Sequence, residues 1–255
     1  MEPFFSLQTN FEELHKKCKV HLRYYSTKQH PEHLHKLRVT IKRIKALFRL
    51  ANAADTRFNN DKFYKPYRKL FKAAGKIREA QVHIQNLQLL TGKKRSAETE
   101  QLKRGIRQMN AAFVSMQVDF ISSIDKRSEE IGEKLKRIKS ARLQKCFATD
   151  LKQICKRVYA IRRADKLHSF RKKLKRLMYN NELTSAKNRM LTRSYLKAID
   201  DLQDTIGKWH DAELLKFMAM QEVSLKNYLP ALEKQCDKLL METERLLSLL
   251  RQKCA

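Results

Sequence analysis

The chain has 255 residues, of which 56 are Lys or Arg and 27 are Asp or Glu, giving a formal net charge of +29. With only 5 Gly and 4 Pro, it lacks the frequent turns of a β-sheet protein, so we predict an all-α fold. A hydrophobic content of 42% excludes a wholly disordered chain. The large positive charge indicates a polyanionic partner.

The N-terminus has no basic stretch ahead of an apolar run, so it does not predict a secretory signal. No uninterrupted apolar run approaches the roughly 18 residues of a transmembrane helix. The cysteines form no Cys-x-x-Cys pair and are expected to be buried or incidental thiols in a reducing compartment. They are Cys18, Cys146, Cys155, Cys236 and Cys254. We therefore expect a cytoplasmic protein.

The first strong element is the segment His35–Arg49, which follows a predicted helix over Phe11–Tyr25 and is opened by Pro31. Read as a helix, it has one apolar face and one cationic face. The apolar face consists of Leu37, Ile41, Ile44 and Phe48. The cationic residues fall within an arc of about 80° and are His35, Arg38, Lys42, Lys45 and Arg49.

This cationic row is about 20 Å long at about 1.5 Å per residue. Like charges at helical spacing are unfavourable in an isolated helix, and a solvated surface is the simplest explanation of a single row. A second copy changes that interpretation, because His168, Arg171 and Lys175 repeat the first spacing about half a chain length later. Two matched rows favour one anion site built from both halves.

Each half also contains a glycine followed four residues later by an acidic side chain. Gly75 and Glu79 follow a predicted helix over Lys62–Ala74, and Gly207 and Asp211 follow the corresponding segment of the second half. The glycine is predicted to end one helix with a positive φ, and the acid to lie in the first turn of the next helix.

The remaining segments complete two similar halves. Residues Glu98–Ile124 are predicted as one long helix, residues 125–145 as an exposed helix or linker, and Pro230–Arg251 as a final helix. The shared order predicts an internal duplication with repeats 1–124 and 125–255. We expect about four to five helices in each, arranged as two bundles about a pseudo-twofold axis with a central basic groove or pore.

The combined pattern resembles the CHAD family, the conserved histidine α-helical domain. Its hallmark helix, His-x2-Arg-Val-x2-[Arg/Lys]-Arg-x-Arg, matches His35–Lys45, and its glycine-acid motifs match Gly75–Glu79 and Gly207–Asp211. The match covers nearly the whole chain in the same order. Glu79 replaces the usual Asp, and Met178 replaces an Arg that is usual in the second repeat.

The resemblance implies a stand-alone, non-catalytic domain that binds inorganic polyphosphate in a basic groove and is compatible with association with polyphosphate granules. A row of Arg, Lys and His donors suits a linear chain of phosphates. No catalytic residue, metal site or cofactor is predicted. The candidate binding residues are His35, Arg38, Lys42, Arg43, Lys45, Arg49, Arg78, His168, Arg171, Lys172, Lys175 and Arg176. Arg43 and Arg176 lie about 80° off the rows.

Two other functions use the same cations. A nucleic-acid-binding protein would use them on phosphodiesters, but no ribonucleoprotein motif, zinc-finger spacing or interleaved aromatic side chain supports it. An enzyme, or an accessory subunit of a phosphate-metabolising enzyme, is the further alternative. The near-match Glu98-Thr99-Glu100, with Lys103, departs from a triphosphate-tunnel motif, and no phosphate-cradling Gly loop is present. The histidines at 30, 33 and 35 fit no common zinc spacing.

Overall fold

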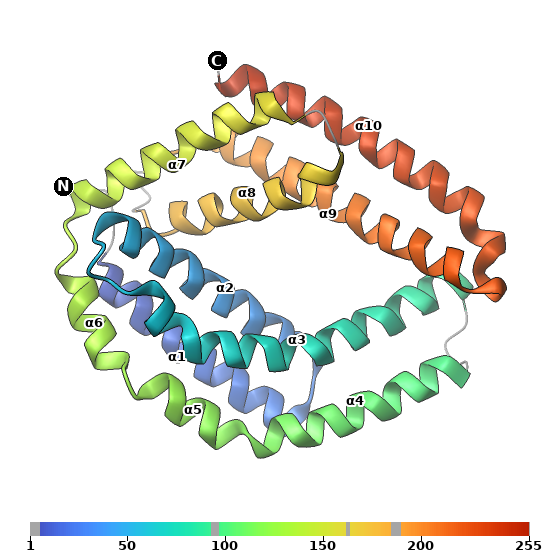
Figure 1. Cartoon of the computed structure of the whole chain (residues 1–255), viewed down its shortest axis with the longest axis horizontal. Coiled ribbons are helices and arrows are strands. Elements are labelled where there is room, and N and C mark those ends of the chain that lie inside the picture. The colour runs from blue at the N-terminus through green and yellow to red at the C-terminus, as the bar shows by residue number, and fades with distance from the viewer. Residues whose placement is uncertain (1–5, 93–96, 162–163, 185–189, 255) are drawn as a thin grey trace. The chain divides into compact units, whose positions relative to one another are not determined.

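A computed structural model describes residues 6–92, 97–161, 164–184 and 190–254. Within these ranges every regular element is a helix (Figure 1), which confirms the predicted all-α fold. The chain divides into two compact units, Met1–Cys146 and Phe147–Ala255. No helix in the described ranges has the length and apolar character needed to cross a lipid bilayer.

The helices of the first unit are α1 (Leu7–Lys28), α2 (Pro31–Ala54), α3 (Asn60–Thr91), α4 (Ala97–Ser115), α5 (Gln117–Asp125) and α6 (Ser128–Lys136). Helix α7 (Ser140–Ala160) begins in the first unit and ends in the second. The other helices of the second unit are η1 (Ala164–Lys166), α8 (Leu167–Asn181), α9 (Arg193–Gln221), η3 (Val223–Tyr228) and α10 (Leu229–Cys254).

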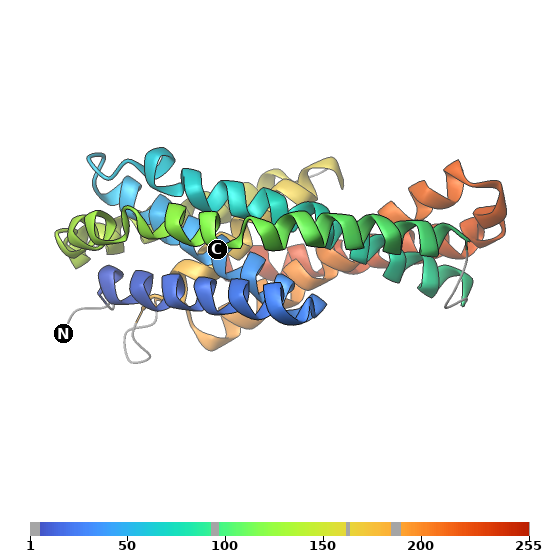
Figure 2. The same ribbon diagram turned by 90° about the horizontal axis from the view of Figure 1, so that it is seen from below.

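The core of the first unit is built on the apolar face of α2, as its periodicity predicts. Leu37, Ile41, Ile44 and Phe48 have no exposed surface. The Phe48 ring lies at the centre of an aromatic cluster, with ring centroids 5.5 Å from Phe11, 5.3 Å from Phe58 and 6.0 Å from Tyr67. Helix α2 packs between α1 and α3 (Figures 1 and 2), so its opposite, cationic side lies at the surface.

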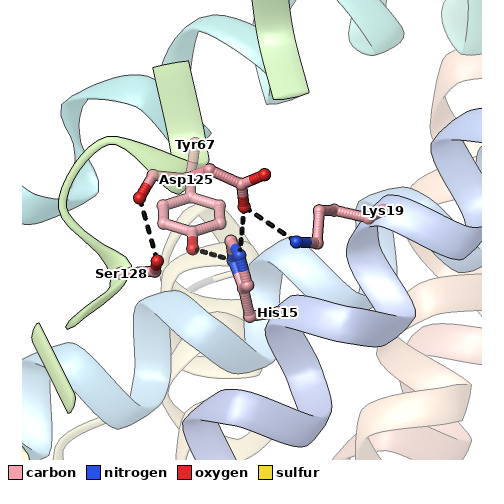
Figure 3. A network of polar contacts seen from close by, with 5 residues as sticks. All are labelled: His15, Lys19, Tyr67, Asp125 and Ser128. Carbon is pink, nitrogen blue, oxygen red and sulfur yellow. Dashed lines mark hydrogen bonds and ion pairs between the residues drawn. The ribbon is translucent and has the colours of Figure 1, made fainter. Parts of the chain in front are cut away.

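A polar network fixes the end of α5 against α1 and α3 (Figure 3). His15 Nδ1 lies 2.7 Å from the Tyr67 hydroxyl, and its Nε2 lies 2.6 Å from Asp125, which also accepts from Lys19 at 2.9 Å. Burial lowers the pKa of His15 below its usual 6.5, although Asp125 opposes this shift. The neutral ring therefore accepts from Tyr67 and donates to Asp125.

Contacts between helices also place α5 and α6 in the first unit. Helices α5 and α6 pack on α1, and α5 also packs on α3. The predicted repeat boundary between residues 124 and 125 therefore falls inside the first compact unit. The predicted single helix over Glu98–Ile124 is also interrupted, because α4 ends at Ser115 and α5 begins at Gln117.

The second unit is built on α8, α9 and α10. Phe170, Leu174 and Leu177 of α8 are buried, and they lie at the same spacing from His168 as Leu37, Ile41 and Ile44 of α2 from His35. Helix α9 packs against both α8 and α10, and Figure 1 shows these three helices in yellow, orange and red.

One cysteine expectation is wrong. Cys155 near the end of α7 and Cys254 at the end of α10 form a disulfide, with Cα atoms 5.3 Å apart. The residues are far apart in the sequence and show no spacing motif; packing alone brings these helix ends together. Cys18 and Cys236 are buried free thiols, as expected.

The predicted glycine turns are also wrong. Helix α3 continues through Gly75, and α9 continues through Gly207. Among the described residues, φ is positive only at Gln29 (49°) and Gly92 (64°). Both glycines are therefore helical, and their acidic neighbours lie in the middle of a helix instead of in a first turn. Each glycine lies beside an arginine side chain from a neighbouring helix, Arg38 at Gly75 and Arg171 at Gly207.

Candidate functional site

The first unit carries a cationic face on α2 and α3. It comprises His35, Arg38, Lys42, Lys45 and Arg49 of α2, joined by Arg78 of α3. His35, Lys42 and Arg49 are exposed, whereas Arg38, Lys45 and Arg78 are half-buried. We call this set the first cationic face. The helical spacing of α2 thus places its predicted binding residues along one side, and α3 supplies the sixth.

The Arg38 guanidinium packs against the backbone of α3 beside Gly75, an arrangement that we call the arginine seat. Its guanidinium Cζ lies 4.2 Å from the centroid of the Phe71 ring, and Nη1 donates to the Phe71 carbonyl at 3.0 Å. A Cβ on Gly75 would lie 2.6 Å from that Nη1 atom. Glycine is therefore needed here for the close approach of a guanidinium to the helix backbone.

Several cations of this face are partly buried, which affects their electrostatics. Burial lowers the pKa of Arg38, the charge of Arg78 lowers it further, and Glu79 opposes the shift. The Lys45 ammonium lies 5.2 Å from the centroid of the Tyr64 ring. Burial raises the pKa of Tyr64 to about 12, so this hydroxyl stays protonated beside the cations. The Phe71 and Tyr64 rings of α3 thus contact Arg38 and Lys45 of the row. This feature was not predicted from the α2 sequence.

The second unit carries a corresponding face on α8 and α9. It comprises His168, Arg171, Lys172 and Lys175 of α8 with His210 of α9, and we call it the second cationic face. The side chain of Lys172 is exposed, and the other four are half-buried.

Arg171 has the same kind of seat as Arg38. Its Nε donates to the Gln203 carbonyl at 2.7 Å. A Cβ on Gly207 would lie 2.5 Å from Nη2, 3.0 Å from Cζ and 3.1 Å from Nε of Arg171. In both units the acceptor carbonyl lies four residues before the glycine, so the predicted duplication extends to a matching arginine-carbonyl-glycine arrangement.

Acidic side chains of α9 affect the pKa of Lys175 in the second face. Burial lowers the pKa of Lys175, and the charge of Arg171 adds to this effect. Asp204, Asp200 and Asp211 of α9 oppose the shift. Asp211 therefore favours the charged form of Lys175, and Glu79 favours the charged form of Arg38 in the first unit.

Two predicted residues lie away from the rows. Arg176 donates to Asp150 of α7 at 3.0 Å, which connects α8 to α7. Arg43 is half-buried beside the first face, about 80° from its centre line. The charge of Arg176 is therefore paired with a carboxylate of a neighbouring helix.

His210 is the residue that the sequence reasoning missed. Its ring centroid lies 4.4 Å from that of His168. It occupies the position in the glycine-acid motif that corresponds to Arg78, one residue before the acid. Aligning the two motifs residue by residue would have identified it.

Within the described ranges, no group of three or more His, Cys, Asp or Glu side chains is arranged to hold a metal ion. The arrangement offers donors and positive charge along two helix faces, which suits the binding of an extended anion.

Comparison with known proteins agrees with this organisation. The family model of the CHAD domain matches residues 12–219. A crystal structure of the CHAD domain from the plant Ricinus communis matches with a TM-score of 0.59 at 18% identity, covering 100% of this chain and 93% of that chain. No curated protein matches the sequence. Because the family model spans far more than half of its length, the chain belongs to the CHAD domain family.

Proposed function

We propose that this protein binds inorganic polyphosphate, without catalysis, along its two cationic faces. The observation that carries the proposal is the repeated arginine seat: Arg38 and Arg171 each donate to a helix carbonyl beside a glycine, within a row of further cations. A seated guanidinium loses less conformational entropy on binding than a free one. A row about 20 Å long suits a linear polyanion better than a single phosphate.

Membership of the CHAD family supports this ligand class, since CHAD domains are linked to polyphosphate binding. Nucleic acid remains the competing polyanion because of the net charge of +29. The aromatic rings beside the first face give it little support, because Tyr64 is buried and the Phe71 ring is covered by Arg38. Tyr64 and the face of Phe71 that Arg38 covers are therefore not accessible for stacking with a base.

The test is calorimetric titration with long-chain polyphosphate and, separately, with single-stranded RNA at matched phosphate concentration and physiological salt. Replacing His35 and Arg49 by Ala removes two exposed donors from the first face. We expect about a tenfold or greater loss of polyphosphate affinity, which corresponds to about 1.4 kcal/mol. His168→Ala with Lys172→Ala is the corresponding change in the second face.

The matched control is Lys36→Ala, because Lys36 lies on α2 but off the row and pairs with Glu32. It removes the same charge from the same helix and is expected to change affinity by less than about twofold. Equal losses from Lys36→Ala and from a face variant would show that only the diffuse charge matters. Equal affinity for RNA and polyphosphate would favour the nucleic-acid alternative.

Two further measurements address the finer points of the proposal. Combining the changes in both faces tests the sequence-based expectation of one groove shared by the two repeats. In one shared site the two losses of binding free energy add, whereas with two independent sites a change in one face leaves the affinity of the other site unaltered. Incubating the protein with polyphosphate and divalent cations, and measuring the phosphate released, tests the non-catalytic role. Release faster than in a heat-unfolded control would contradict that role.

A further inference from the structure

The second cationic face contains a histidine pair that the first face lacks. The rings of His168 on α8 and His210 on α9 have centroids 4.4 Å apart and an interplanar angle of 42°. His168 Nδ1 is shielded from solvent and has no hydrogen-bond partner among the described residues. Its Nε2 is therefore the atom through which this ring can donate to an anion.

The surroundings of His168 disfavour its charged form. Burial lowers the pKa of His168, and the charges of Lys172, His210 and Arg171 lower it further. The free protein at neutral pH therefore holds His168 largely uncharged.

The elements around the pair carry further charged groups, most of which are paired with one another. On α9, Glu213 interacts with His210 and is paired with Lys216 at 2.9 Å. From α10, Cys236 is hydrogen-bonded to Glu213 and Glu233 interacts with Lys216. The preceding η1 carries Asp165 and Lys166, which pair with each other. From α7, Arg157 and Asp150 face Lys173 and Arg176, further along α8.

The corresponding position in the first unit is occupied by Arg78. An arginine keeps its charge throughout the physiological pH range, whereas a histidine changes charge within it. The two faces therefore share the arrangement of Arg38 and Arg171 but carry side chains at this position that respond differently to pH.

We propose that His168, paired with His210, forms an anion subsite in which His168 takes up a proton when a phosphate group binds beside the two rings. This inference rests on the proposed function and names the pH regulation of that binding. An anion supplies the opposite charge that His168 lacks in the free protein, so it favours the protonated His168 ring. By linkage, the affinity for the anion then rises as the pH falls.

The test is polyphosphate titration from pH 5.5 to 8.5, with long chains whose internal phosphates keep one charge each across this range. Uptake of about one proton gives up to about a tenfold gain in affinity per pH unit. Titration in two buffers of different ionisation enthalpy measures the protons directly. We expect His210→Arg to flatten the pH dependence, and Arg78→His to steepen it by transferring the pair to the first unit.

His21→Gln is the control, because this histidine lies on α1 and should leave the slope unchanged. An NMR titration of the His168 ring adds a readout of charge, with protonation expected at lower pH in the free protein than in the complex. Absence of polyphosphate binding at every pH would overturn the proposed function together with this inference. Binding whose slope is the same in the parent protein, His210→Arg and Arg78→His would overturn this inference alone.

Discussion

The arginine seat predicts an unusual response to adding one methyl group to a helix. Gly207→Ala replaces a mid-helix glycine, a change that ordinarily stabilises a helix by about 0.5–1 kcal/mol. Here the new Cβ would lie 2.5 Å from Nη2 and 3.0 Å from Cζ of Arg171. The guanidinium must therefore leave its position, and with it the 2.7 Å hydrogen bond to the Gln203 carbonyl.

A hydrogen bond that involves a charged group contributes about 1.5–3 kcal/mol. Subtracting the gain in helix propensity leaves a net destabilisation of about 1–2 kcal/mol for Gly207→Ala. Gly75→Ala should cost less, because only the terminal Nη1 of Arg38 lies close to its Cβ position, with Cζ at 3.7 Å. Gly105 on α4 provides the control: no described atom lies within 4 Å of its Cβ position, so Gly105→Ala should stabilise the protein by about 0.5–1 kcal/mol.

The assay is urea denaturation followed by far-UV circular dichroism and by the fluorescence of Trp209. This residue is the single tryptophan of the chain and lies on α9, so its signal reports the second unit. In an Arg171→Ala background the clash is gone, and Gly207→Ala should become stabilising. A stabilising Gly207→Ala in the parent protein, equal to that of Gly105→Ala, would refute the seat.

Three other predictions concern stability. Because the folded protein lowers the pKa of His15, the unfolded chain binds more protons below its usual pKa of 6.5, and stability should fall as the pH drops from 6.5; urea midpoints at pH 5 and 7.5 measure this, and His15→Gln should reduce the difference. Reducing the Cys155–Cys254 disulfide, or replacing both residues by Ser, should cost about 2–5 kcal/mol by thermal denaturation; Cys236→Ser keeps the disulfide and should show the same response to reductant as the parent protein. Asn110→Ala should cost about 1–3 kcal/mol in urea, because it removes the acceptor of the buried Tyr25 hydroxyl at 2.7 Å; an unchanged midpoint would show that water replaces the amide.

Much of the architecture follows from the sequence alone, because helical periodicity is a local property. The spacing of Leu37, Ile41, Ile44 and Phe48 assigned the buried side of α2, and the matched spacing after His168 assigned that of α8. The start of α2 at Pro31 was likewise predicted from local signals. Composition was sufficient for the all-α class, since few turns are possible with so few Gly and Pro residues.

The sequence did not predict which side chains of different helices contact one another, and only the tertiary structure shows these contacts. Gly75 and Gly207 have the sequence signature of helix ends, but their role depends on an arginine from another helix that no local pattern reveals. The Cys155–Cys254 bond and the packing of Asp125 on His15 also join residues far apart in the chain. A side chain's own helix determines the direction in which it points, whereas the helix packed against it determines what it contacts and whether it can carry a charge.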